Sequence, residues 1–450
     1  MWHGLKRCVF LAGTAWVLSA AARSPAQNWP SFRGPNGSGV GTGTPPTTWN
    51  IETGENVKWK TAIPGLSHAS PIVWGEHVFL ATAVSSEPDP HLKVGMYGSG
   101  KPVPDEPKHE WRVLCLDRKT GRILWQKTAH AGTPKVKRHP KATQANSTPA
   151  TDGKRVVAFF GSEGLYCYDM SGTLLWKKDL GTLDAGPYNA PDLQWGFASS
   201  PVLFDDRVIV QCDVHGGGFL TVLDADTGKE IWRTARDDVS TWSTPTVYVG
   251  DDRSQVIVNG YRHIGGYDLR SGQELWKLRG GGDVPVPTPF VAQGLIFITN
   301  AHGRMRPIYA IRPSAAGDIT PAAGESSNAS IAWWRDKRGA YMPTPVVYGD
   351  LLYVGDDRGI LTTYDAKSGE KVYRLRVIKG QGGAYTASPV AAGGKVFLTG
   401  EDGDILVIKA GRKYELLATN SMNAICMATP AIADGQLFVR TKSHLYCIAE

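Results

Sequence analysis

The side chains of this 450-residue chain that could do chemistry are carboxylates, histidines and aromatic residues spread along the sequence. Glu163, Asp213 and Asp356 could serve as general bases or calcium ligands, since carboxylate oxygens suit both roles. No short spacing links these acids, and an Asp beside a turn more often caps the backbone. The eleven His are dispersed, and none stands in a recognisable motif with a carboxylate and a nucleophile. These patterns favour a binding protein over an enzyme.

Cysteine usage excludes several kinds of site. The chain has six Cys, with no adjacent pair, no CxxC and no CxxCH haem-attachment motif. Cys115, Cys167 and Cys447 recur at one place of a sequence repeat, and equivalent positions of different repeats cannot easily meet. We therefore expect small buried hydrophobic residues, with neither a disulfide framework nor a zinc site.

The N-terminus has the order of a secretory signal. Lys6 and Arg7 precede the apolar run Cys8–Ala22, and small residues follow up to Ala26. This order predicts a signal peptide over residues 1–26 and a periplasmic or secreted protein. The alternative is a retained membrane anchor, although the apolar run falls short of the roughly 20 residues that a spanning helix needs.

Charge gives no support for a nucleic-acid partner. Loss of residues 1–26 would remove three basic residues and no acid from a formal net charge of +7. The densest basic run is Lys135–Arg138, and no basic stripe with interleaved aromatic residues is present. We expect this run to be a solvated loop.

A sequence repeat runs along the chain, and the elements that it predicts must position these side chains. A Ser-Pro or Thr-Pro step precedes a short apolar run at eight places, and 44 residues is the commonest separation. The steps are Ser70-Pro71, Thr148-Pro149, Ser200-Pro201, Thr244-Pro245, Thr288-Pro289, Thr344-Pro345, Ser388-Pro389 and Thr429-Pro430. A period of 40 to 50 residues is typical of propeller blades.

Each unit predicts four short antiparallel strands. The last two are joined by a repeated hairpin, D-x-x-[ST]-G-x-x-x-[WY], in which Gly allows positive φ, Asp caps the turn and the aromatic residue packs on the next sheet. The copies run from Asp117 to Trp125, Asp224 to Trp232, Asp268 to Trp276 and Asp365 to Tyr373, with one shorter copy from Asp169 to Trp176.

The last unit, residues 429–449, lacks a fourth strand. Residues 55–63 supply a spare one, with Trp59 at the repeated Trp position, and pairing it there closes the ring and removes an exposed edge. We therefore predict an all-β fold, a single eight-bladed β-propeller of four-stranded antiparallel blades over residues 56–450. Residues 27–55 form an N-terminal extension.

At these residues the chain resembles the PQQ-repeat superfamily of eight-bladed propellers, and most closely its exported bacterial PQQ-binding-like subgroup. The segments that carry the resemblance are Asn28–Pro35, Trp195–Pro201, Ile311–Thr320 and Leu445–Cys447. The superfamily contains quinoprotein alcohol dehydrogenases and the non-enzymatic propeller lipoprotein of the outer-membrane assembly machinery. Two functions follow: a binding or scaffold module, and alternatively a PQQ-dependent alcohol or sugar dehydrogenase with PQQ and calcium. The adjacent cysteines that mark the dehydrogenases are absent.

Loops at one end of the channel give the candidate site. In an antiparallel blade, the loop into the first strand and the loop from the second to the third lie on the same face. An aromatic floor with mixed charges there suits a small polar ligand, a peptide or a protein partner; the alternative is an ordinary propeller rim of polar loops and aromatic plugs. The candidate residues are Trp195, Trp242, Tyr341, Tyr385, Asn146, Glu163, His215, Arg262, Arg304 and Asp356.

Three insertions interrupt the regular units, over residues 85–110, 178–194 and 313–332. Each is rich in Pro, Gly or Ser. They could be lids or partner-binding loops, because functional loops are often long, or solvated excursions.

Overall fold

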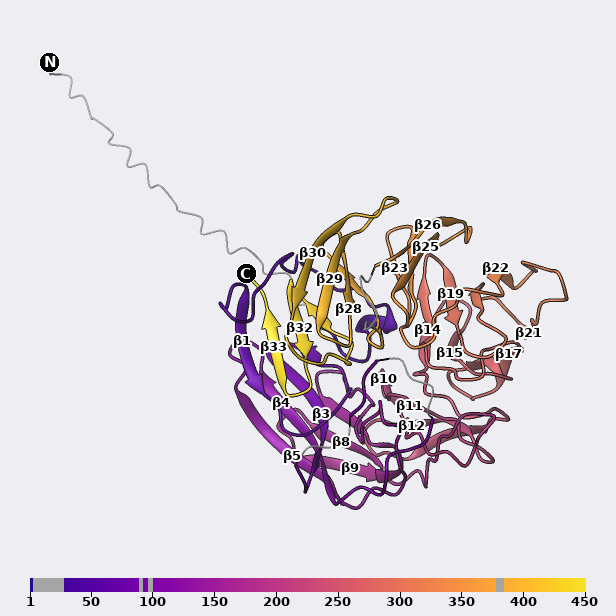
Figure 1. The fold of residues 1–450 in the computed structure, drawn as a ribbon, viewed down its shortest axis with the longest axis horizontal. Helices are drawn as coiled ribbons and strands as arrows, with labels where there is room; N and C mark the ends of the chain where they lie inside the picture. The colour runs from indigo at the N-terminus through magenta and orange to yellow at the C-terminus, as the bar shows by residue number, and fades with distance from the viewer. Residues whose placement is uncertain (3–27, 89–91, 96–99, 378–383) are drawn as a thin grey trace.

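Eight sheets form a closed ring in the computed structural model, which describes residues 1–2, 28–88, 92–95, 100–377 and 384–450 (Figure 1). This confirms the predicted eight-bladed propeller. Helix in this part of the chain is limited to two short 3-10 turns, η1 (Pro35–Gly37) and η2 (Gly161–Glu163). Nearly all of the predicted signal peptide lies outside the described residues.

The blades are numbered here in chain order, each with its innermost strand first. Blade 1 consists of β2 (Ile72–Trp74), β3 (His77–Ser85), β4 (His109–Asp117) and β5 (Ile123–Gly132), and blade 2 of β6 (Ala150–Thr151), β7 (Arg155–Phe159), β8 (Leu165–Asp169) and β9 (Leu174–Lys178). Blade 3 consists of β10 (Val202–Phe204), β11 (Arg207–Cys212), β12 (Phe219–Asp224) and β13 (Glu230–Ala235). Blade 4 consists of β14 (Thr246–Val249), β15 (Ser254–Val258), β16 (Ile264–Asp268) and β17 (Glu274–Leu278), with β21 (Gly317–Asp318). Blade 5 consists of β18 (Phe290–Ala292), β19 (Leu295–Thr299), β20 (Ile308–Ile311) and β22 (Ile331–Arg335), and blade 6 of β23 (Val346–Tyr348), β24 (Leu351–Gly355), β25 (Ile360–Asp365) and β26 (Lys371–Arg376). Blade 7 consists of β27 (Val390–Ala392), β28 (Lys395–Thr399), β29 (Asp404–Lys409) and β30 (Leu416–Ser421). Blade 8 consists of β31 (Ala431–Ala433), β32 (Gln436–Arg440) and β33 (His444–Ile448), with β1 (Val57–Ala62) as its outermost strand.

Strand alternation gives the ring two distinct faces. The loops that lead into the first strands, and those that join second to third strands, lie at one end of the channel, here called the loop face. The hairpins that join first to second and third to fourth strands lie at the other end, the hairpin face. The core lies between neighbouring blades; for example, Val208, Ile209 and Val210 of β11 are fully buried because both sides of the sheet are covered.

Blade 4 departs from the four-stranded prediction. Its edge strand β17 takes a fifth strand, β21, which pairs in parallel through Trp276↔Gly317 and Lys277↔Asp318. Strand β21 comes from the insertion 313–332, and Arg253 donates hydrogen bonds to the carbonyls of Pro313 and Ala315. This insertion is therefore packed along the outside of blade 4.

The ring closes as the sequence predicts. Strand β1 pairs antiparallel with β33, with Trp59 opposite Cys447 and Lys60 opposite Tyr446. Trp59 also donates from Nε1 to the carbonyl of Arg118 in blade 1, at 2.9 Å. The N-terminal strand thus completes blade 8 and ties it to the first blade.

The geometry of the repeated hairpin shows why the same residue types recur in it. In blade 1, the backbone N–H and hydroxyl of Thr120 donate to Asp117 Oδ1 at 2.7 and 2.6 Å. Gly121 has a φ of +73°, and a Cβ there would lie 2.5 Å from the ring of Trp59 in the preceding blade. Glycine is needed both for the turn and for the close approach of this Trp.

The Ser/Thr-Pro steps link the innermost strands around the channel. The backbone N–H of Ser70 donates to the hydroxyl of Thr148, that of Thr148 to Ser200, and that of Ser200 to Thr244. The same bond recurs from Thr288 through Thr344, Ser388 and Thr429, at 2.9 to 3.0 Å. Six of the eight steps thus donate to a hydroxyl of the next blade, which fastens these neighbouring blades together.

The N-terminal extension crosses the hairpin face and fills the channel; its η1 turn is the indigo segment inside the ring of Figure 1. Arg33 is fully buried and donates to the carbonyls of Thr344, Pro345 and Pro389 at 3.0, 2.6 and 3.3 Å. Burial lowers the pKa of its guanidinium to about 9. The side chain of Arg33 thereby joins blades 6 and 7 from inside the ring.

The cysteines match the sequence prediction. Cys115, Cys167, Cys212, Cys426 and Cys447 are buried, and none of them forms a disulfide. Burial raises the pKa of the Cys115 thiol to about 12, so it stays protonated and unreactive. Within the described ranges, no helix is long and apolar enough to cross a membrane.

Candidate functional site

Two Trp side chains from neighbouring loops meet on the loop face. Trp195 and Trp242 have ring centroids 5.8 Å apart, and His139 lies edge-on to Trp195 at 5.0 Å. Trp195 donates from Nε1 to the carbonyl of Gly100 at 2.6 Å, and Trp242 donates to Gly196 at 2.7 Å. Both indole N–H groups are therefore bonded within the protein.

Described residues of the insertion 85–110 contact the loops beside this Trp pair. Arg138 is buried and donates to Glu106 of the insertion at 2.9 and 2.7 Å, while Val103 N–H donates to the carbonyl of Arg138. Glu401 of blade 7 accepts from the backbone N–H of Gly95 in the insertion at 2.7 Å and from Lys141 Nζ at 2.5 Å. These contacts fasten the described residues of the insertion to the loop before blade 2 and to blade 7.

Asn146 and Glu163 of blade 2 lie close together on the loop face. They line a cavity of about 10 Å³ that has room for about one water molecule. Glu163 accepts from the backbone N–H of Lys135 at 2.9 Å, and Asn146 donates to the carbonyl of Phe197 at 3.1 Å. Burial raises the pKa of the Glu163 carboxyl. Both side chains already have partners within the protein.

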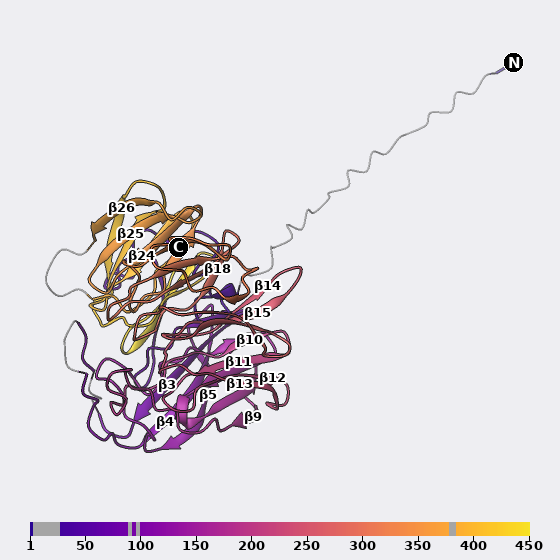
Figure 2. The ribbon, with the colours of Figure 1, turned by 90° about the vertical axis from the view of Figure 1, so that its right-hand side faces the viewer.

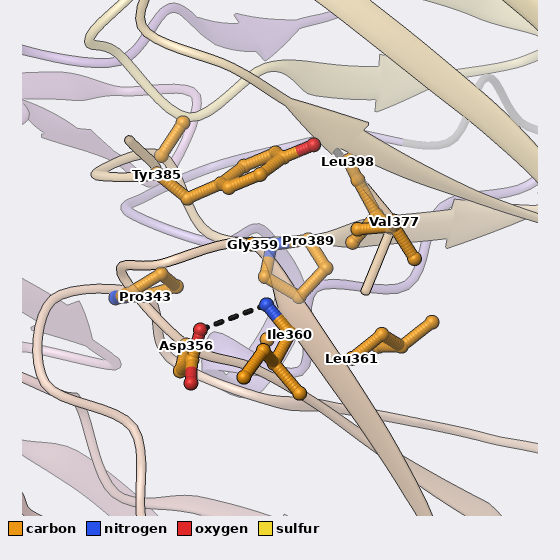
Figure 3. A pocket seen from close by; sticks show the side chains of 11 residues that line it. Pro343, Asp356, Gly359, Ile360, Leu361, Val377, Tyr385, Pro389 and Leu398 are labelled. Atoms are coloured by element: carbon orange, nitrogen blue, oxygen red, sulfur yellow. Dashed lines mark hydrogen bonds between the residues drawn. The ribbon is translucent and has the colours of Figure 1, made fainter. Parts of the chain in front are cut away.

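Tyr385 and Asp356 line a second small cavity, also of about 10 Å³, between blades 6 and 7 (Figure 3). Asp356 accepts from the backbone N–H of Arg358 and of Ile360 at 2.9 and 2.8 Å, as a turn cap does. Tyr385 is buried, which raises the pKa of its phenol. Its ring lies on the other side of the cavity from Asp356.

These residues do not fit PQQ with calcium. Glu163 and Asp356 belong to blades 2 and 6, and each is committed to backbone groups. The cavities they line hold about one water molecule each, far less than a fused-ring quinone needs. No three His, Cys, Asp or Glu side chains gather as a metal site in the described part of the chain.

The loops of blades 4 to 6 on the loop face carry a dyad that sequence reasoning missed. His302 Nδ1 lies 2.5 Å from Asp283 Oδ1, and its ring centroid lies 5.4 Å from that of Tyr341. His302 has a φ of +81°, which is strained for a residue other than glycine. Burial and the carboxylates of Asp357 and Asp283 raise the pKa of Tyr341 to about 12. Asp283 and His302 lie in different loops, so no motif signalled the pair.

Four arginines lie in the loops of blades 4 to 6 that carry or neighbour this dyad: Arg262, Arg304, Arg306 and Arg358. All are exposed, and among the described residues no side chain forms an ion pair or a side-chain hydrogen bond with their guanidinium groups. We call these four, with His302 and Tyr341, the arginine rim.

A buried acid holds the loop that carries Arg262. Asp238 accepts from the backbone N–H groups of Tyr261, Arg262 and His263 at 3.0 to 3.3 Å. Arg236 pairs with Asp213 at 2.7 Å and lies 3.6 Å from Asp238, with all three side chains fully buried. Asp213 is thus part of a structural network and not a free general base.

The insertion 178–194 borders the arginine rim. Its Tyr188 packs on Tyr261 with ring centroids 5.0 Å apart. His215 Nε2 lies 3.3 Å from the carbonyl of Gly186. The ten candidate residues therefore fall into separate groups, and of these Tyr341, Arg262 and Arg304 belong to the arginine rim.

The sequence matches one family. A family model described as outer membrane protein assembly factor BamB matches residues 109–375 and 218–450. BamB of Yersinia pestis is 25% identical over 369 residues, 79% of this chain and 77% of that protein. BamB of Escherichia coli strain K12 is 27% identical over 228 residues, 48% of this chain. The chain spans about half the length, 51%, of this relative and of the Shigella dysenteriae relative.

Solved structures share the fold. BamB from Moraxella catarrhalis has a TM-score of 0.54 at 14% identity, covering 77% of this chain and 94% of that one. A europium-containing methanol dehydrogenase has a TM-score of 0.62 at 12% identity, over 92% and 89% of the two chains. Quinohemoprotein alcohol dehydrogenase from Comamonas testosteroni has a TM-score of 0.60 at 14% identity, over 96% and 82%. At these identities the likeness concerns the fold alone.

Proposed function

The chain belongs to the family described as outer membrane protein assembly factor BamB, within the PQQ-repeat propellers, and from this membership we propose that it is a binding scaffold without catalytic activity. Its partner is a protein of outer-membrane assembly, and the arginine rim is the binding surface. The protein works outside the cytoplasm, after cleavage of residues 1–26.

The observation that carries the proposal is the set of unpaired arginines around Tyr341. Arg and Tyr are enriched at protein interfaces, where the planar guanidinium can bind a carboxylate through two hydrogen bonds. The network around Asp238 holds the loop of Arg262 in place before a partner arrives, which lowers the entropic cost of binding. An acidic segment of the partner is the complement that this surface favours.

The candidate residues outside the arginine rim support the same interpretation. Trp195, Trp242, Asn146 and Glu163 lie in loops of blades 2 to 4 and are bonded internally. They act as aromatic plugs and loop anchors, whereas the arginines of the rim are exposed.

Photo-crosslinking in cells of the source organism tests the proposal. A crosslinking amino acid replaces Arg304 or Arg358 on the rim and, as a control, Lys367 on the hairpin face of blade 6. The rim positions should capture one outer-membrane assembly protein, and Arg262→Glu should reduce that product at least tenfold. Equal products from Lys367, or none from the rim in a folded protein, would contradict the proposal. N-terminal sequencing of the recovered protein should begin near Gln27.

A further inference from the structure

The hairpin face of blades 1 and 2 exposes two apolar pairs. Ile123 and Leu124 begin β5 with 37% and 41% of their surface exposed, and Leu174 and Leu175 begin β9 with 46% and 47%. The equivalent positions of blades 4 to 6 show no exposed large hydrophobic side chain. Exposure of these apolar side chains to water is unfavourable, and contiguous exposed apolar patches often mark interaction sites.

Packing between the two blades joins the pairs into one surface. Trp125 of β5 donates from Nε1 to the carbonyl of Met170 in the blade 2 hairpin, at 3.0 Å. A Cβ on Gly172 of that hairpin would lie 2.9 Å from Lys127 Cε and from the Trp125 ring. The hairpin that leads into β9 therefore sits directly on β5. We call the two apolar pairs and the cations around them the apolar-basic patch.

Five exposed cations flank the apolar pairs: Lys119, Arg122, Lys127, Lys154 and Lys177. None forms an ion pair with another described residue. The nearby carboxylates are engaged elsewhere: Asp117 and Asp169 cap their own turns, and Asp152 pairs with Arg155 at 2.5 Å. Glu76 is the exposed acid that remains at the blade 1 hairpin. The surface is thus apolar at its centre, and around it the five cations outnumber the carboxylates of Glu76, Asp117 and Asp169.

The chain enters the propeller on the hairpin face of the same two blades. Asn28 Oδ1 accepts from the backbone N–H of Gly75 at 2.8 Å, Trp29 pairs with Val73, and Pro30 accepts from Thr151 N–H. These contacts lie at the hairpin ends of blades 1 and 2. The sequence before Asn28 holds the apolar run Cys8–Ala22. The point of entry at Asn28 and the apolar-basic patch therefore lie on the same face of the propeller, the hairpin face.

We propose that the apolar-basic patch docks the propeller on the surface of an anionic lipid bilayer. Leu and Ile side chains would enter the headgroup region while the lysines stay with lipid phosphates, as in interfacial membrane segments. The arginine rim lies at the opposite end of the channel, so docking points it away from the membrane. This inference does not rest on the proposed partner, since lipid binding can be measured with no partner present.

Vesicle sedimentation tests the docking. The chain from Gln27 contains every blade and the whole N-terminal extension, so it isolates the patch from the apolar run. It should bind vesicles of phosphatidylglycerol and phosphatidylcholine more tightly than vesicles of phosphatidylcholine alone, and lose binding as salt rises. Each of Lys119→Ala and Lys154→Ala should weaken binding about fivefold. Leu174→Ser with Leu175→Ser should weaken it at least as much.

Blade 7 offers a matched control. Leu416 and Leu417 are exposed by 46% and 37% at the equivalent start of β30, away from the point where the chain enters. The double change to Ser at these positions should leave vesicle binding unchanged, and melting curves should show all variants folded. Equal losses from both Leu pairs would overturn the proposal, as would absent binding to anionic vesicles. It would also fail if Leu174 and Leu175 instead hold two copies of the chain together, seen as a dimer that the Ser changes dissociate.

Discussion

Lys141 Nζ lies 2.5 Å from Glu401 Oε1, so an ion pair joins the loop before blade 2 to a loop of blade 7. Only 19% of the Lys141 side chain and 2% of the Glu401 side chain is exposed. Glu401 also accepts from the Thr386 hydroxyl and from the backbone N–H of Gly95. Glu401 of this pair therefore also anchors Gly95 of the insertion 85–110.

Breaking this pair should both destabilise the protein and free the insertion. Glu401→Ala leaves Lys141 without its acid, and loss of one partner of a buried pair costs about 3 kcal/mol of unfolding free energy. Urea unfolding measures the loss, and limited proteolysis should cut within residues 85–110 sooner than in the native chain. Lys409 and Glu415 form an exposed pair at 3.1 Å, so Glu415→Ala is the control and should change neither result. Unchanged proteolysis of Glu401→Ala would show that the other contacts alone hold the insertion.

The hairpin glycines give a second prediction, with a matched pair. Gly349 and Gly369 have φ of +63° and +70°, but a Cβ would meet nothing within 4 Å at Gly349 and the Trp333 ring at 2.5 Å at Gly369. Gly349→Ala should cost only the left-handed backbone, about 1 kcal/mol. Gly369→Ala adds overpacking between blades 5 and 6, for a total of about 3 kcal/mol. Equal costs by urea unfolding would mean that the Trp contact is not tight.

Closure by the N-terminal strand gives a third prediction. Deletion of residues 27–63 removes β1, Trp59 and Arg33, which exposes the edge of β33 and empties the channel. Unfolding should lose its cooperativity, and the protein should associate through the free edge. Calorimetry and light scattering measure these effects. A melting curve like that of the chain from Gln27 would contradict the closure.

The regular parts of the fold were predictable because their signals are local and repeated. The hairpin from Asp117 to Trp125 contains its own cap, turn and packing residue, and the number of Ser/Thr-Pro steps, eight, equals the number of blades. Trp59 could be assigned to blade 8 because it matches the repeated Trp. The hydrogen bond from six of these steps to the next hydroxyl was not predicted, since it joins different blades.

The candidate site was less predictable. Strand alternation places all ten candidate residues at loops of one face, but it does not say which loops are covered. Lys141 and Glu401 are separated by 260 residues and meet because two irregular loops of blades 2 and 7 lie side by side, which no local sequence pattern predicts. The His302–Asp283 pair was missed for the same reason. Arg306 and Arg358 join the arginine rim by position alone, and no motif distinguishes them from other surface arginines.

Stability should fall as the pH drops from about 6.5 to 4. Burial, with smaller effects from nearby cations, lowers the pKa of His68 and of His139 to about 4 in the folded protein. An unfolded His binds its proton near pH 6.5, so the unfolded state takes up protons in this range and the folded state does not. Each histidine then contributes a loss of up to about 1.4 kcal/mol per pH unit. Below pH 4 both states are protonated and this contribution no longer grows.

Substitution of His68 checks the assignment. His68→Gln removes the titrating group, so urea unfolding free energies at pH 7.5 and 5 should differ less than in the native chain. A native chain equally stable at both pH values would refute the proton linkage.

Added PQQ and calcium should not bind. Glu163 and Asp356 are engaged with backbone groups on different blades, and the cavities they line hold about one water molecule each. The chain from Gln27 should therefore show no shift in melting temperature with PQQ and calcium, no retained quinone after gel filtration, and no dye-linked oxidation of alcohols or aldoses. A quinoprotein dehydrogenase treated in parallel confirms that the cofactor is active. Oxidation of alcohols or aldoses by the native chain, abolished by Glu163→Ala or Asp356→Ala in a folded protein, would overturn the scaffold proposal. The protein would then be an enzyme whose cofactor reacts beside these carboxylates. Retained quinone without turnover would instead place a ligand site under the insertion 85–110, and Glu401→Ala should then speed its exchange.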